Sequence, residues 1–292
     1  MTTFEGIWVP LVTPFGGGGA RVDFTHLQAL TDRLVREGID GLVVCGTTGE
    51  PATLTAQEQD RVLDAVLEAA GACPVVFGVA GNDTAAVAAS VRRRRGDGVT
   101  GFLLSAPYYT RPSQAGIVRH FEVVAAAAEQ PIVIYNIPYR SGVNIEFETL
   151  QTLARNPQFV AIKQSAGHDA DQLAELIRHT PLKVLSGEDA MIFVNACLGG
   201  HGAIAAAAHI RPDLYRRMLD QVRGGDLVAA RGIADALRPW IRALFAEPNP
   251  APLKAALAAL GLIEDGLRLP LLPATAECRA RVERMLPAIM AL

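Results

Sequence analysis

The chain has 292 residues, of which 50% are hydrophobic and 20% charged, and its formal net charge is −3. A chain of this length and hydrophobicity buries a large core, as one sizeable α/β domain or two small ones, which excludes a disordered or fibrous protein. The small acidic charge and the lack of a lysine-rich tract argue against a nucleic-acid-binding surface.

Cysteine and histidine usage indicate a cytoplasmic protein without a metal. The four cysteines, at positions 45, 73, 197 and 278, form no C-x-x-C pair, which favours free thiols in a reducing compartment. The six histidines show no ligand spacing, so we expect no metal site. We expect no other cofactor. The amino terminus lacks the features of a signal peptide, and no uninterrupted apolar stretch reaches the roughly 18 residues of a membrane span.

Short apolar runs recur along the first two thirds of the chain, separated by segments with a helical period. Strands that alternate with helices pair in parallel, and eight such units predict an α/β fold of the closed (β/α)8 TIM-barrel type. A doubly wound sheet is the alternative, but it favours a G-x-G-x-x-G turn that this chain lacks. The eight runs are residues 7–12, 41–45, 74–79, 101–105, 132–135, 159–162, 183–185 and 203–206.

After about residue 225 the strand pattern ends, and residues 226–245, 252–260 and 276–292 have helical patterns. We therefore predict a barrel domain over residues 1–224, with the catalytic residues, and a carboxyl-terminal helical extension over residues 225–292.

Two further segments, a glycine run and an arginine cluster, are interpreted as structural features and not as binding sites. The four glycines at 16–19 lack the lysine and hydroxyl of a phosphate-binding loop, so we interpret them as a flexible loop tip. The arginines at 92–95 follow an alanine-rich helical stretch, and cations suit the carboxyl end of a helix, so we expect a solvated helix terminus there.

The chain contains three lysines, Lys163, Lys183 and Lys254, among 27 basic residues. Lys163 ends the sixth apolar run, and in a barrel the chemistry gathers at the carboxyl ends of the strands. Burial lowers a lysine pKa, as a Schiff-base nucleophile requires, although a lysine at a strand end is more often solvated. Lys183 opens the seventh run and Lys254 lies in the helical extension, where we expect no proton relay.

The ends of other runs supply groups that a Schiff-base mechanism needs. Tyr135 lies one strand before Lys163, and a phenol moves protons when other hydroxyls are bonded to it. Thr47 and Tyr109 are the candidate relay partners, although Tyr109 alone is more simply a core or interface aromatic.

Two other residues are candidates for binding carboxylates. Thr48 stands in a glycine-flanked turn whose backbone N–H groups a ligand approaches closely. Arg140 offers a planar fork for a second carboxylate, although a lone arginine is usually a surface cation.

Taken together, these segments resemble the dihydrodipicolinate synthase and N-acetylneuraminate lyase superfamily of pyruvate-dependent class I aldolases, almost from end to end. The matching motifs are V-P-L-V-T-P-F at 9–15, G-T-T-G-E at 46–50, Y-Y-T-R-P-S-Q at 108–114, Y-N-I-P at 135–138, I-K at 162–163, S-G-E-D at 186–189 and E-P-N-P-A-P at 247–252.

The resemblance implies a role for each candidate. Lys163 forms the pyruvate imine, Tyr135, Thr47 and Tyr109 relay protons, and Tyr109 reaches across a tight-dimer interface. Thr48 binds the pyruvate carboxylate, while Gly187 and Ile204 line the site. The resemblance thus implies a homo-oligomer, as a tight dimer or as a dimer of dimers (a homotetramer), with no nucleic-acid or membrane partner.

Arg140 occupies a position typical of the synthase branch, where an arginine holds the carboxylate of aspartate semialdehyde. The implied substrates are therefore pyruvate and this aldehyde, in lysine and diaminopimelate synthesis. Three departures leave open another aldolase or dehydratase, acting on a different aldehyde or a 2-keto sugar acid. These are G-A-I-A-A-A-A-H at 202–209, K-Q-S-A-G at 163–167, and Tyr139 beside the arginine. A catalytically silent keto-acid sensor has no need of the whole relay.

The resemblance also bears on regulation. Lysine-inhibited members carry a serine, two histidines and a glutamate where this chain has Pro51, Ala56, Gln59 and Ala86, although Asn82 and Tyr108 remain. We therefore expect lysine to inhibit weakly or not at all.

Overall fold

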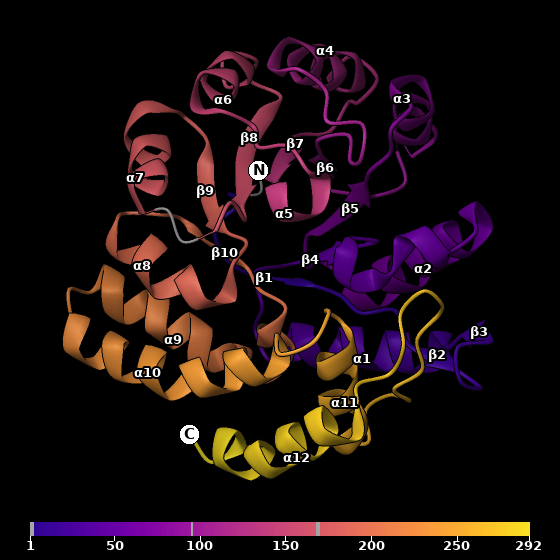
Figure 1. Ribbon diagram of the computed structural model, residues 1–292, viewed down its shortest axis with the longest axis vertical. Helices are drawn as coiled ribbons and strands as arrows, with labels where there is room; N and C mark the ends of the chain where they lie inside the picture. Colours follow the sequence, from indigo (N-terminus) through magenta and orange to yellow (C-terminus); the bar gives the residue numbers. More distant parts are fainter. Residues whose placement is uncertain (1–2, 95, 168–169) are drawn as a thin grey trace. The chain divides into compact units, whose positions relative to one another are not determined.

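The computed structural model describes residues 3–94, 96–167 and 170–292. All eight predicted runs form strands, and these close into a barrel with the order β1-β10-β9-β8-β7-β6-β5-β4 (Figure 1). The strands are β1 (Gly6–Pro10), β4 (Gly41–Val44), β5 (Val75–Val79), β6 (Gly101–Ser105), β7 (Ile132–Asn136), β8 (Phe159–Gln164), β9 (Lys183–Ser186) and β10 (Gly202–Ile204). The TIM-barrel prediction is confirmed, and the doubly wound alternative is wrong.

Helices follow the strands, and polar residues define where several of them begin. The side chains of Asp23, Thr55, Asp83 and Ser113 accept hydrogen bonds from backbone N–H groups in the first turns of the helices they precede. The helices up to residue 223 are α1 (Phe24–Arg36), α2 (Ala56–Ala70), α3 (Thr84–Arg93), α4 (Gln114–Ala125), α5 (Pro138–Ser141), α6 (Phe147–Leu153), α7 (Ala170–His179), α8 (Ile192–Cys197) and α9 (Pro212–Arg223).

The predicted carboxyl-terminal helical extension is also confirmed. It contains α10 (Leu227–Leu244), α11 (Ala251–Ala259) and α12 (Ala276–Met290). The chain divides by contacts into two compact units, residues 1–6 with 74–204 and residues 7–73 with 205–292. The predicted domain boundary at residue 224 stays a prediction.

The first unit contains β5 to β10 and α3 to α8. Its strands are almost wholly buried, as expected for parallel strands whose faces are both covered. In Figure 1, α3, α4, α6 and α7 form an arc outside these strands, and helices that follow one another in this arc pack together. This packing fixes the strand ends on which the candidate residues stand.

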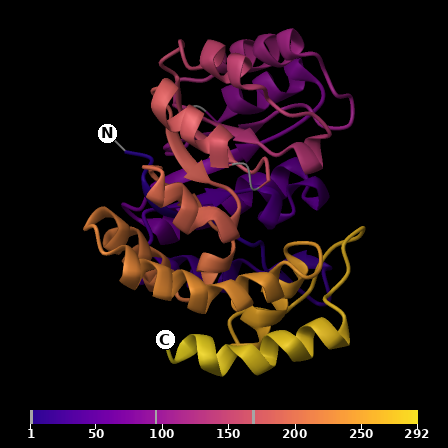
Figure 2. The same ribbon diagram turned by 60° about the vertical axis from the view of Figure 1, so that its left-hand side comes forward.

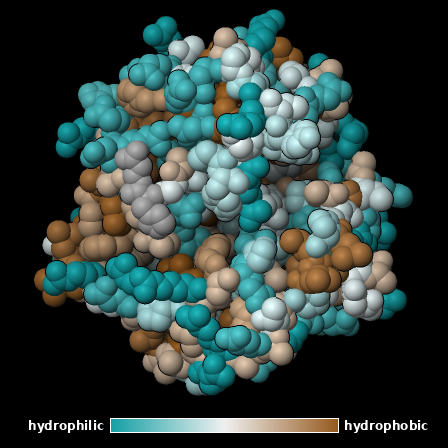
Figure 3. Space-filling view, in the orientation of Figure 1, coloured by the Kyte–Doolittle hydropathy of each residue, from teal (hydrophilic) through white to brown (hydrophobic). Residues whose placement is uncertain are grey.

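The second unit contains β1, β4, α1, α2 and α9 to α12. Its core includes the fully buried side chains of Trp8, Tyr215 and Trp240. Helices α11 and α12 pack side by side in Figures 1 and 2. Figure 3 shows a row of hydrophilic residues along α10, which is the solvent side expected of an amphipathic helix.

Two segments singled out in the sequence have defined places in the fold. The glycine run 16–19 forms the turn of the short hairpin β2 (Phe15–Gly16) and β3 (Arg21–Val22), and Gly17 N donates to Glu264 Oε2 (3.1 Å). The flexibility expected of this tip stays a prediction. In the arginine cluster, Arg92 and Arg93 are exposed at the end of α3, as expected.

Arg94 differs from its neighbours, since it is buried and its guanidinium lies 4.1 Å from the ring centroid of Phe77. Position 95 lies outside the described residues. Within the described parts of the chain, no helix is both long and apolar enough to cross a membrane.

Candidate active site

Lys163 stands near the carboxyl end of β8, as predicted, and its side chain is buried. Backbone pairing holds β8 between β7 and β9. The strand register places Lys163 beside Tyr135 of β7 and Leu185 of β9. The Lys163 Nζ atom lies 4.4 Å from the centroid of the Tyr135 ring. The amine and the phenol predicted to work together are therefore neighbours.

The surroundings of Lys163 favour a neutral amine. Burial lowers the pKa of Lys163 from 10.5 to about 8, with a smaller contribution in the same direction from Arg140. The nearby acidic groups of Asp189, Tyr139 and Glu188 oppose this effect and keep its pKa from falling further. An uncharged amine is the form that attacks a carbonyl, so this lysine is suited to nucleophilic work near neutral pH.

Gly187 lies close against the Lys163 side chain. A Cβ atom at Gly187 would stand 2.9 Å from Lys163 Cγ and 3.0 Å from Cε, and it would collide with Ser165 Oγ. The position is therefore open only to glycine, for reasons of space. Ser165 is fully buried, and its hydroxyl has no hydrogen-bond partner among the described residues.

Ile204 lies at the same level as Gly187. Parallel pairing sets Ala203 of β10 beside Ser186 of β9, so Ile204 and Gly187 are each one residue further along. Ile204 is buried and Gly187 half-buried. The first unit thus brings Tyr135, Lys163, Gly187 and Ile204 together at the carboxyl ends of β7 to β10.

Glu188 is a titratable neighbour to which the sequence interpretation gave no role. Burial and the adjacent Asp189 raise the pKa of Glu188 from 4.5 to about 7, while Lys163 and Arg140 oppose that rise. A carboxyl group that titrates near neutral pH beside a perturbed lysine is a candidate acid–base group. The signal was present in the S-G-E-D motif, which places two carboxylates directly after a strand.

The short helix α5, which follows β7, carries Arg140, and the Arg140 side chain lies at the surface. Its Nε donates to Tyr139 Oη (3.3 Å), and its guanidinium lies 5.3 Å from that ring's centroid. The buried Asn136 holds the segment that follows α5, since its Nδ2 donates to Asn144 Oδ1 and its Oδ1 accepts from Ile145 N. These hydrogen bonds support the segment next to Arg140, whose side chain is exposed to solvent.

Tyr109 does not share the buried environment of Lys163, because its side chain is 88% exposed. Its backbone has a positive φ of 66° and its N–H donates to Ser141 O (3.2 Å). A positive φ is uncommon for a residue with a side chain, so this loop holds an outward tyrosine in a restricted conformation. Its predicted reach into a neighbouring protomer stays a prediction.

Thr47 and Thr48 belong to the second unit, in the 3₁₀ turn Thr47–Gly49 that follows β4. Thr48 is buried, and its Oγ1 accepts a hydrogen bond from Asn249 Nδ2 (2.9 Å). Thr13 Oγ1 donates to Gly49 O (2.7 Å), which holds the turn against the segment after β1. The assembly of these two threonines with Lys163 stays a prediction.

Lys254 has surroundings that the sequence interpretation missed. It is fully buried, and its Nζ donates to Glu50 Oε1 (2.5 Å). The signal was the run A-P-L-K-A-A-L-A-A-L, which is apolar on every side of a helix and therefore indicates burial all round. Lys183, by contrast, pairs with Glu5 (2.9 Å) and is half-exposed.

Comparison with known proteins gives one consistent result. The model of the dihydrodipicolinate synthetase family matches residues 3–289. A relative from Syntrophobacter fumaroxidans, named 4-hydroxy-tetrahydrodipicolinate synthase, is 40% identical over 289 residues and covers 98% of each chain. One from Thermomicrobium roseum with the same name is 39% identical, covering 98% of this chain and 93% of its own.

Solved structures agree. Dihydrodipicolinate synthase from Thermotoga maritima has a TM-score of 0.95 at 33% identity and covers 99% of this chain and all of its own. The enzyme from Cyanidioschyzon merolae with lysine bound has a TM-score of 0.95 at 34% identity and covers both chains completely. The chain therefore belongs to the dihydrodipicolinate synthetase family.

Proposed function

We propose that the protein condenses pyruvate with L-aspartate 4-semialdehyde to give 4-hydroxy-tetrahydrodipicolinate, through an imine on Lys163. The observation that carries this proposal is a buried lysine whose pKa falls to about 8 directly beside a tyrosine. Relatives that carry the corresponding name provide further support. A structure of the Acinetobacter baumannii synthase is described as complexed with pyruvate.

The chemistry follows from the groups at hand. The neutral Lys163 amine adds to the ketone carbon of pyruvate, and loss of water from the carbinolamine gives the imine. Removal of a methyl proton then gives an enamine whose carbon attacks the aldehyde. We assign the proton transfers to Tyr135, with Thr47 and a partner's Tyr109 completing the relay.

The substrate contacts belong to the same proposal. We assign the pyruvate carboxylate to Thr48 and the second carboxylate to Arg140, whose guanidinium is exposed to an incoming ligand. Gly187 leaves space beside the Lys163 stem, and Ile204 supplies an apolar wall. Exchange of the Lys163 nitrogen for the amine of the bound semialdehyde then closes the ring and frees the enzyme.

A second candidate is another pyruvate-dependent aldolase or dehydratase, acting on a different aldehyde or a 2-keto sugar acid. The Tyr139 phenol favours it, because this group accepts a hydrogen bond from Arg140 and so occupies part of the guanidinium fork. The alanine-rich segment after β10 also favours it, since it offers no hydroxyls.

We further propose that lysine inhibits this protein weakly or not at all. Where lysine-inhibited members are expected to carry histidines, this chain has Ala56 and Gln59, and the Gln59 amide of α2 donates to Pro51 O (3.1 Å) in the 3₁₀ turn before that helix. We also propose a cytoplasmic homo-oligomer built from tight dimers, because the exposed Tyr109 needs a neighbouring protomer to complete its proposed role.

Borohydride reduction in the presence of pyruvate, followed by peptide mass analysis, tests the imine. We expect an adduct on Lys163 alone. Lys254 is the internal control, because burial also lowers its pKa to about 8 while Glu50 engages its amine. An unmodified Lys163 refutes the imine mechanism. Turnover with aspartate semialdehyde, compared with other aldehydes and 2-keto sugar acids, then separates the two candidates.

A further inference from the structure

Three residues of the carboxyl-terminal segment donate hydrogen bonds to the turn that follows β4. Asn249 Nδ2 donates to Thr48 Oγ1 (2.9 Å), Lys254 Nζ donates to Glu50 Oε1 (2.5 Å), and Arg268 N donates to Glu50 Oε2 (3.3 Å). All these residues belong to the second unit. The carboxyl-terminal segment therefore holds the glycine-flanked turn in place through hydrogen bonds, in addition to packing against neighbouring helices.

The Lys254–Glu50 pair fixes the end of this turn. Both side chains are completely buried, and Lys254 Nζ also donates to Gly266 O (2.9 Å) and lies 4.3 Å from the ring centroid of Phe15. Glu50 has a left-handed backbone with φ of 54°. A buried ion pair contributes little net stability but allows few alternative geometries, so it is well suited to fixing one backbone arrangement.

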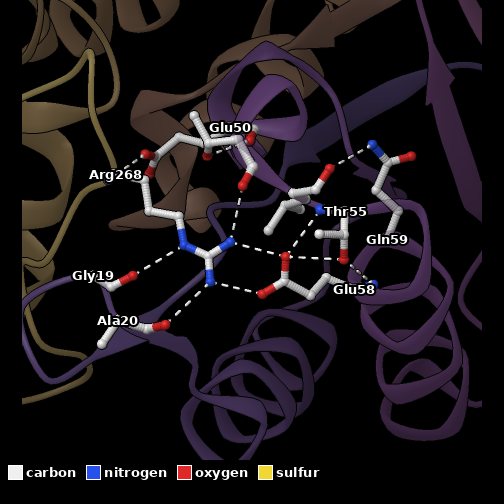
Figure 4. A network of polar contacts seen from close by, with 9 residues as sticks. Gly19, Ala20, Glu50, Thr55, Glu58, Gln59 and Arg268 are labelled. Carbon is white, nitrogen blue, oxygen red and sulfur yellow. Dashed lines mark hydrogen bonds and ion pairs between the residues drawn. The ribbon is translucent and has the colours of Figure 1, made fainter.

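Arg268 bonds to Glu50 through its backbone N–H, and its side chain ties the same region to neighbouring segments. Figure 4 shows its guanidinium between the Gly19 and Ala20 carbonyls on one side and the Glu58 carboxylate on the other. Arg268 lowers the pKa of Glu58 to about 2 through this ion-paired hydrogen bond. Glu58 also completes the capping box of α2 with Thr55, so the loop at 264–268 is tied to the first turn of that helix.

The contact from Asn249 sets the direction of hydrogen bonding at Thr48. An amide nitrogen is only a donor, so the Thr48 oxygen accepts from it and keeps its own hydrogen to donate elsewhere. A carboxylate is only an acceptor, and therefore it is the partner that suits a hydroxyl oriented in this way. Asn249 is half-buried, which limits competition from water.

We propose that Asn249 is a positioning residue that orients the Thr48 hydroxyl as a donor toward the carboxylate of the 2-oxo acid. The Lys254–Glu50 pair holds the turn that carries it. This inference rests on the proposed role of Thr48 in pyruvate binding, and Asn249 acts through Thr48 without touching the reacting atoms.

Asn249→Asp tests the direction of the hydrogen bond with almost no change of shape. A carboxylate at 249 accepts the Thr48 hydrogen and places negative charge beside the substrate anion. We expect the pyruvate concentration that half-saturates borohydride trapping on Lys163 to rise at least about tenfold. At saturating pyruvate, the rate of trapping and its pH midpoint stay near those of the wild type.

Asn156→Asp is the matched control, because Asn156 uses its side-chain oxygen to accept from Gln158 N (3.0 Å), and a carboxylate keeps that bond. We expect it to behave like the wild type. Asn249→Ala raises the half-saturating concentration by about fivefold. In a Thr48→Val background, Asn249→Ala has no further effect, whereas a general structural role for Asn249 would still show one.

The outcomes are distinguishable. No trapping by the wild type refutes the proposed function itself. If the wild type is trapped but Asn249→Asp shows an unchanged dependence on pyruvate concentration, only the inference is overturned. The Asn249 amide would then serve as an acceptor or as a spacer. If Asn249→Asp does not fold, as judged by circular dichroism, the Asn249→Ala titration decides, and an unchanged half-saturating concentration overturns the inference.

Discussion

Replacing Glu188 with glutamine should shift the pH dependence of imine formation to lower pH. The ionised carboxylate of Glu188 raises the pKa of Lys163, against the larger lowering by burial. Glutamine keeps the shape and removes the charge, so the pKa of Lys163 should fall below its present value of about 8. The pKa of Glu188 is about 7, so its carboxylate is mostly charged at the higher pH where Lys163 titrates.

The magnitude follows from the fraction of neutral amine. A pKa of about 8 leaves about one-tenth of Lys163 neutral near pH ~7, roughly 300-fold more than the ordinary value of 10.5 allows. Loss of one nearby opposite charge lowers a lysine pKa by about one unit. Near pH ~8, where Glu188 is mostly ionised in the wild type, the neutral fraction of Lys163 should therefore rise from about one-half to about nine-tenths, so imine formation should quicken about twofold.

Single-turnover borohydride trapping with pyruvate alone measures this effect across the pH range, without involving the second substrate. Near pH ~9.5, variant and wild type should coincide, because the amine is neutral in both. Glu175→Gln on the exposed face of α7 is the control and should leave the midpoint unchanged. A midpoint in Glu188→Gln that equals or exceeds that of the wild type would refute the reasoning.

Three further predictions concern packing, stability and regulation. Gly187→Ala should reduce imine trapping at least about tenfold, since the new Cβ presses on the Lys163 side chain. The same Cβ collides with Ser165 Oγ and should lower thermal stability, so adding Ser165→Ala should restore the stability but not the trapping. Lys254→Met should cost about 3–5 kcal/mol in urea unfolding because it strands the buried Glu50 carboxylate, while Glu50→Gln with Lys254→Met should cost clearly less. In a coupled assay, submillimolar lysine should leave activity nearly unchanged, and strong inhibition there would contradict the regulatory proposal.

The barrel was predictable because its signals are local. Each strand is a short apolar run, and a polar cap such as Asp23 or Thr55 marks where a helix begins. Lys163 was predictable for the same reason, since one residue in an apolar strand end stands out. The resemblance in sequence then supplied roles that no single segment indicates.

The missed features depend on partners far apart in the chain. Lys254 meets Glu50 across 204 positions, and the Arg94 guanidinium covers the ring of Phe77 on another element. A charged residue is usually exposed, so composition alone assigns such residues to the surface. The perturbed carboxyl of Glu188 likewise depends on burial that only the folded chain creates.

The distribution of lysines has a practical consequence for attaching this protein to surfaces or labels. Amine-directed esters require an accessible, uncharged amine, and arginine does not react with them. Two of the three lysine side chains are buried, whereas the Lys183 side chain is 38% exposed at the amino-terminal end of β9. Apart from the chain's amino terminus, bulky reagents should therefore couple through a single position. A support attached there would leave the carboxyl ends of β7 to β9 facing away from it.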